Sequence, residues 1–188
     1  MRRRISTIAI VATCISCKES AWTPMGSADL VLSQIKLGGG AAVGKRIDTD
    51  PTFAESVMSG ISSGDSAWIE VARQLAPTSA AAEASVSIAL ASALPKAPRR
   101  VLPLLRRRVS LEEVCGIPFL EADSGEIMRY SDSTAAALGG VHDSTLVGIR
   151  DKCTRALNDA RTVKLSRIDP SYIVKNKPTP APRRTRRR

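Results

Sequence analysis

The chain has 188 residues, with 28 lysines and arginines against 18 aspartates and glutamates, which gives a formal net charge of +10 at pH 7. Hydrophobic residues make up 43% of it, enough for a folded core, so a fully disordered chain is excluded. Only 3% of the residues are aromatic, and a core of small aliphatic side chains favours close-packed helices over a β-sandwich. A single histidine excludes a histidine-rich zinc site and makes a Ser-His-Asp enzyme improbable.

The N-terminus has the pattern of an export signal. Arg2, Arg3 and Arg4 precede a mostly apolar run over residues 5–16. This run is shorter than the roughly 20 residues that span a bilayer, but it has the length of a signal-peptide core. We therefore predict a signal peptide over residues 1–17, a tether over residues 18–26, and a location in the periplasm or cell envelope. A buried N-terminal helix is the alternative.

Residues 14–17, Cys-Ile-Ser-Cys, look like the lipobox of bacterial lipoproteins, in which the last cysteine carries the lipid. The lipobox has leucine where this chain has Cys14. Cys17 is therefore predicted either to be lipidated, as the anchored N-terminus of the mature protein, or to be discarded with the signal.

Apolar periodicity predicts an all-α domain over residues 27–168, built as a short stack of antiparallel amphipathic helices. The predicted helices cover residues 28–37, 51–59, 66–76, 80–94, 99–107, 124–138 and 144–163. Residues 38–49 are predicted as a loop, Gly60 as the end of the second helix, and residues 62–64 as a linker. No strand pair is predicted.

Residues suited to cap helices precede most of these segments. The predicted N-caps are Ser27, Asp50, Asp65, Ser79 and Asp143. A further predicted cap, Ser110, opens a capping box with Glu113 just before Cys115.

Cys115 and Cys153 are the cysteines left in the predicted mature domain. Cys153 lies on the apolar stripe of the last helix with Leu146, Ile149 and Leu157, so it should point into the core. In an oxidising compartment we expect the two to form a disulfide. Two independent buried thiols are the alternative, and a catalytic thiol pair is disfavoured because the spacing is not Cys-x-x-Cys.

Other candidate chemistry is thin, and we predict no catalytic residue, cofactor or metal site. Residues 39–45 fit the Gly-x-x-x-x-Gly-Lys pattern of a phosphate-binding loop, but Arg46 stands where serine or threonine should contact magnesium. A Gly-rich flexible connector is the preferred interpretation. His142 and Asp143 are best explained as the start of a helix.

Two charged stretches are also predicted to have structural roles. An acidic stretch around Cys115 is predicted as a solvated face; it comprises Glu112, Glu113, Glu121, Asp123 and Glu126. The arginines at 99–100 and 106–108 flank a short helix. The second group lies at the C-terminal end of this helix, where positive charge is favourable, and an anion site is the alternative.

Residues 169–188 are rich in proline and basic residues and are predicted to be a disordered tail. Arg183, Arg184, Arg186, Arg187 and Arg188 are the candidate polyanion-binding residues. Anionic lipid head groups suit an exported protein and nucleic acid suits a cytosolic one. A merely solubilising tail is the alternative. The ten basic residues in the two ends account for the whole net charge, since residues 5–174 balance.

The stretch from Gly64 to Leu157 resembles small exported bacterial proteins of uncharacterised function. The matching residues are Gly64-Asp65, Trp68, Val71-Ala72, Leu90, Ala93-Leu94-Pro95, Pro98, Val101-Leu102, Val114-Cys115 and Pro118-Phe119. This resemblance implies an envelope location and a helical fold, and it carries over no activity.

These features predict a non-enzymatic protein of the bacterial cell envelope. Its partner would be an unknown protein or an anionic membrane surface, and the sequence does not specify an oligomeric state. The alternative is a cytosolic protein that associates with nucleic acid through the arginine-rich tail.

Overall fold

The computed structural model describes residues 27–106, 109–119 and 121–172, and all regular structure in these ranges is helical. The predicted all-α class is confirmed. The elements are α1 (Ala28–Gly38), α2 (Gly40–Thr49), α3 (Pro51–Ser63), α4 (Ser66–Gln74), α5 (Ala80–Ala93), α6 (Pro98–Val101), the 3-10 helix η1 (Leu102–Arg106), α7 (Leu111–Val114), α8 (Ser124–Gly139) and α9 (Ser144–Ile168). In the same ranges, none of the helices combines the length and the apolar character that crossing a membrane requires.

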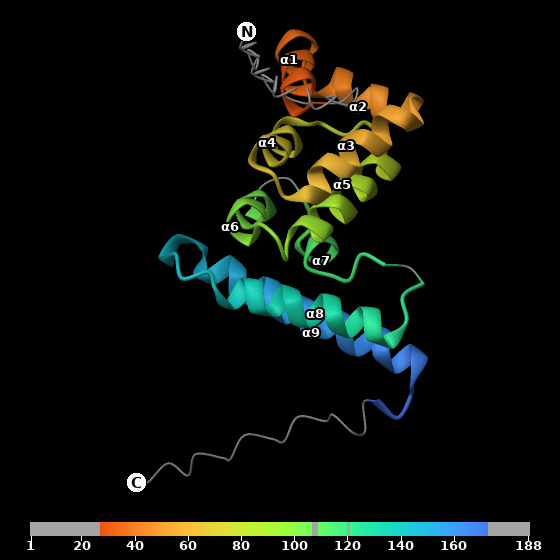
Figure 1. Ribbon diagram of the computed structural model, residues 1–188, viewed down its shortest axis with the longest axis vertical. Coiled ribbons are helices and arrows are strands. Elements are labelled where there is room, and N and C mark those ends of the chain that lie inside the picture. The colour runs from red at the N-terminus through yellow and green to blue at the C-terminus, as the bar shows by residue number, and fades with distance from the viewer. Residues whose placement is uncertain (1–26, 107–108, 120, 173–188) are drawn as a thin grey trace, which may run out of the picture.

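The helices are arranged in an elongated stack (Figure 1). Helices α1 to α7 form one group, and the antiparallel hairpin of α8 and α9 lies across the end of that group farthest from α1. Within the group, α5 packs along α3 and also contacts α7 and α2. Its buried residues lie on several sides of the helix and are Ala82, Val86, Ser87, Ala89, Leu90, Ala91 and Ala93. This helix is therefore the centre of the stack, although its sequence predicts a single buried face.

Local capping chemistry sets where the helices begin. All six predicted N-caps are confirmed: in each, the side-chain oxygen accepts a hydrogen bond from a backbone N–H of the first turn. These caps are Ser27, Asp50, Asp65, Ser79, Ser110 and Asp143. Of the capping box predicted for Ser110 and Glu113, only the Ser110 half forms, whereas Asp123 and Glu126 at the start of α8 form both halves. Each such cap satisfies one of the N–H groups that a helix leaves without an internal partner.

The loop predicted over residues 38–49 is wrong, because residues 40–49 form α2. Gly39, with φ of +82°, separates α1 from α2, a conformation that favours glycine. Gly40 and Gly44 lie one helical turn apart on the side of α2 that meets the last residue of α4 and the chain just after it. A Cβ on Gly40 would lie 2.2 Å from the carbonyl oxygen of Gln74, and one on Gly44 would lie 2.2 Å from that of Ala76. These glycines therefore serve close helix packing and do not form a flexible connector.

The predicted helix end at Gly60 is also wrong, since α3 continues to Ser63 and ends at Gly64 in the left-handed conformation. A Cβ on Gly60 would lie 2.3 Å from the indole of Trp68. Gly60 is thus an internal glycine that leaves room for the large side chain of α4. Residues 62 and 63 of the predicted linker therefore belong to α3, and only Gly64 lies outside it. At the other end of the domain, α9 runs to Ile168, beyond its predicted end at residue 163.

Polar contacts attach the α8–α9 hairpin to the rest of the stack. The Tyr130 hydroxyl of α8 donates to the carbonyl oxygen of Ala91 in α5 at 2.9 Å. Arg99 donates to the carbonyl oxygen of Gly140, beyond the end of α8, at 3.3 Å. Helix α9 also contacts η1 and α7, and its apolar stripe, which includes Leu157, is buried.

Tyr130 gives the fold a predicted pH dependence. Burial raises the pKa of Tyr130 to about 12, above the ordinary value of 10. Because the folded state favours the protonated phenol, its contribution is complete below pH 10 and is lost as the pH rises toward 12. Two pKa units correspond to about 2–3 kcal/mol. Urea unfolding between pH 9 and 12 should show this loss. The Tyr130→Phe variant should lack that part of the dependence, and an identical pH profile in the two proteins would contradict it.

Candidate functional site

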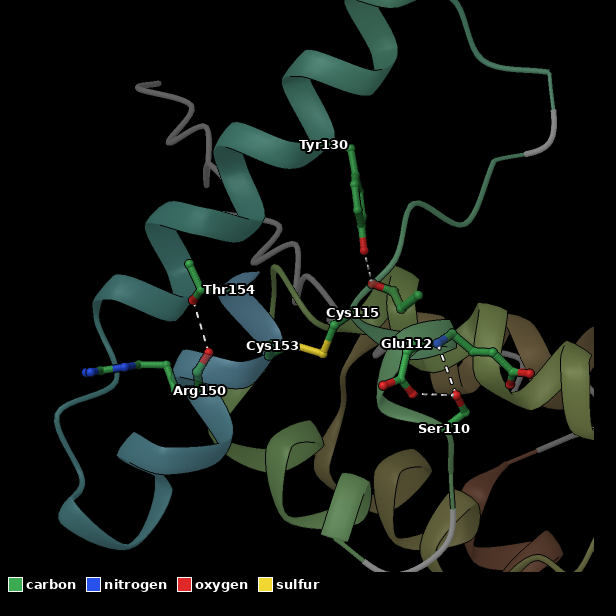
Figure 2. Close-up of a disulfide and its surroundings, with 9 residues drawn as sticks. Ser110, Glu112, Cys115, Tyr130, Arg150, Cys153 and Thr154 are labelled. Carbon is green, nitrogen blue, oxygen red and sulfur yellow. Dashed lines mark hydrogen bonds between the residues drawn. A yellow bond between two sulfur atoms is a disulfide. The ribbon is translucent and has the colours of Figure 1, made fainter. Parts of the chain in front are cut away.

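The predicted site residues Cys115 and Cys153 lie together (Figure 2). Their sulfur atoms are 1.98 Å apart and their Cα atoms 5.2 Å apart, as in a disulfide. Cys115 directly follows α7, whose first turn is capped by Ser110, and Cys153 lies on the buried stripe of α9. The predicted pairing is confirmed, and it ties the α8–α9 hairpin to α7.

The bridge has the surroundings of a structural disulfide. Both cysteines have 0% of their surface exposed, and they adjoin buried Val114 and Leu157. Because both sulfurs are buried, neither is accessible to the thiol of a substrate. Thiol–disulfide exchange requires such access. The acidic residues near the bridge in sequence, Glu112, Glu113, Glu121, Asp123 and Glu126, are all exposed. The predicted solvated acidic face is therefore confirmed.

The basic residues around α6 satisfy the ends of neighbouring helices. Arg100 donates to the carbonyl oxygen of Gly64 at 3.0 Å, and Lys96 donates to that of Ser62 at 2.7 Å, both at the C-terminal end of α3. Together with the bond from Arg99 to Gly140, these contacts place positive charge where helix dipoles favour it. The structural interpretation of Arg99 and Arg100 is thus supported, while residues 107–108 lie outside the described residues.

The phosphate-loop pattern and the His142–Asp143 pair lie in a helix and in a turn of the described residues. Residues 40–45 are helical, so the Gly-x-x-x-x-Gly-Lys stretch has no strand-loop-helix context for a phosphate. His142 is exposed in the turn between α8 and α9, and Asp143 caps α9 as predicted. Among the residues that the structure describes, no three His, Cys, Asp or Glu side chains gather where they could hold a metal ion.

A groove beside the bridge is the feature that the sequence analysis missed. It has a volume of about 770 Å³ and lies between the start of α7 and one face of α9. Ala156, Ala160 and Val163 form its apolar strip. Their spacing in the sequence marks one side of a helix, but the return of α7 to that side is a tertiary contact that periodicity alone does not contain.

The other predicted site residues fall outside the described ranges. These are Cys17, predicted as a lipidation site, and the tail residues Arg183, Arg184, Arg186, Arg187 and Arg188. Both predictions stay as the sequence made them.

Comparison with known proteins adds no relative: none of the protein-family models matches this chain, and searches of curated proteins and of solved structures gave no significant match.

Proposed function

We propose that this protein is an exported, non-enzymatic helical module of the bacterial cell envelope that binds a protein partner or the membrane. The observation that carries the proposal is the fully buried Cys115–Cys153 pair at bonding distance. Disulfides persist in oxidising compartments such as the periplasm, whereas cytosolic thiols are kept reduced. The arginines and apolar run at the N-terminus support the same compartment.

The second candidate is a cytosolic protein that associates with nucleic acid. It is favoured by the five arginines among the last six residues of the sequence, which suit phosphate groups. In that setting Cys115 and Cys153 would be reduced for most of the protein's life. The two candidates therefore differ in both the N-terminus and the redox state of the mature chain.

The N-terminus of the protein purified from its native host tests the proposal. Mass spectrometry should find a chain that starts at Cys17 or later, with or without lipid on that cysteine. The matched control is Ile8→Asp/Ile10→Asp, which places charge inside the apolar run. That variant should retain Met1 and stay in the cytosol. An intact Met1 in the unaltered protein would contradict export and favour the nucleic-acid candidate.

A further inference from the structure

The groove between α7 and α9 has the geometry of a helix-binding surface. Its apolar strip follows α9 at Ala156, Ala160 and Val163, and Val163 is 49% exposed. Arg161, which pairs with Asp132 of α8, lies on the opposite side of α9. The groove face is therefore a side of α9 that α8 leaves open, next to the stripe that carries Cys153. Alanines at i and i+4 let a second helix approach closely.

Charge is distributed unevenly along this groove. Lys152 and Arg155 lie near one end, and Lys164 and Arg167 line it twelve residues later, about 18 Å along the helix axis. Asp159 lies between the two pairs. The groove thus presents positive, negative and positive charge in turn along α9.

These four cations have no ion-pair partner within the described residues. Elsewhere in those ranges four arginines pair with carboxylates at 4 Å or less: Arg46, Arg73, Arg150 and Arg161. Lys164 donates instead to the backbone carbonyl of Phe119. Partial burial lowers the pKa of Lys164, and the charge of Arg167 lowers it further. The groove therefore holds cations that an acidic partner could neutralise.

We propose that this groove binds an amphipathic helix of a partner protein, with acidic residues at both ends of its apolar face. The inference rests on the proposed role as an interaction module and names its surface and partner class. A helical segment can place carboxylates against each cationic pair and leave the middle free of acid. A continuous polyanion, whether a lipid surface or nucleic acid, would meet the carboxylates of Asp159 and of Glu112 on the α7 side. The basic tail of the chain itself would meet like charge.

A pair of synthetic helical peptides tests this inference. Both are fluorescein-labelled and 18 residues long, with leucines on one face; one has glutamates at both ends and lysine in the middle, and the other has these charges exchanged. Binding to the full-length oxidised protein is measured by fluorescence anisotropy in 50 mM and 300 mM NaCl. The peptide with acidic ends should bind at least tenfold more tightly, and the higher salt should weaken it several-fold. Amide NMR shifts should map to α7 and α9.

Charge-reversal variants locate the binding. Lys152→Glu/Arg155→Glu should weaken the acidic-ended peptide about tenfold or more, and Val163→Asp should do so without changing the fold, because that side chain is half exposed. The matched control is Lys36→Glu/Lys45→Glu, which changes the net charge equally on α1 and α2 at the far end of the stack (Figure 1). It should change the affinity less than twofold.

Three results would overturn the inference. They are no binding of the acidic-ended peptide at 1 mM in 50 mM NaCl, equal losses in the groove variant and its control, or binding through Lys152 and Arg155 to vesicles containing phosphatidylglycerol but not to the peptide. The N-terminus and thiol state are read on the same protein. If the chain is mature and oxidised but does not bind the acidic-ended peptide, the proposed groove function is contradicted. The proposed export to the cell envelope is then still supported.

Discussion

Replacing both bridge cysteines with alanine, C115A/C153A, should lower the free energy of unfolding by about 4 kcal/mol. The bridge joins residues 38 positions apart, and the chain-entropy model gives about this value for a loop of that length. Typical domains are stable by only about 5–15 kcal/mol, so the loss is a large share of the total. Urea unfolding followed by circular dichroism measures it, with the oxidised unaltered protein as reference.

The effect should be concentrated in the α8–α9 hairpin. The bridge ties α9 to α7, whereas α3 and α5 pack against each other without it. Hydrogen exchange should therefore accelerate most in α8 and α9 when the bridge is removed. The unaltered protein after reduction is the control and should unfold at a similar urea concentration. An unfolding midpoint that neither reduction nor C115A/C153A shifts would contradict a stabilising bridge.

Substituting the packing glycines of α2 should be the next most damaging change. In Gly44→Ala, the added methyl group would lie 2.2 Å from the carbonyl oxygen of Ala76, a backbone atom that cannot rotate away. Overpacking of this kind costs about 1–3 kcal/mol and sometimes more, so we expect at least about 2 kcal/mol. Gly40→Ala should behave alike, because its methyl group would meet the carbonyl oxygen of Gln74 at the same distance.

Gly148→Ala is the matched control for this prediction. Gly148 is an exposed glycine inside α9, and a Cβ there would have no atom within 4 Å. Alanine should therefore stabilise the protein by about 0.5–1 kcal/mol through helix propensity and the entropy of the unfolded chain. Thermal unfolding should show a lower melting temperature for Gly40→Ala and Gly44→Ala and a higher one for Gly148→Ala. A stabilised Gly44→Ala protein would mean that α2 does not lie against the segment after α4.

Helix starts were predictable because capping is local. Asp50 followed by Pro51, and Asp143 before α9, carry their signal in a few adjacent residues. Glycine roles were not predictable in the same way. Gly60 resembles a helix end in the sequence, and only the position of Trp68 in three dimensions explains why it lies inside α3. The α2 helix was missed for the same reason.

The same distinction between local and tertiary features applies to the candidate site. The pairing of Cys115 with Cys153 could be predicted from the number of cysteines and from the apolar stripe on α9. The groove could not, because it depends on where Leu111 and Glu112 of α7 come to lie beside that helix. The export signal, Cys17 and the arginine-rich tail lie outside the described residues and stay as predictions from the sequence.

The thiol state of the protein inside its native host tests the central claim most directly. Cells are quenched in acid, free thiols are alkylated under denaturing conditions, and peptides are mapped by mass spectrometry without reduction. An exported, bridge-stabilised protein should yield the peptides of Cys115 and Cys153 joined, two hydrogen masses below the sum of the free thiols, in a chain that lacks Met1. Alkylation of both cysteines in most of the trapped protein would contradict the claim.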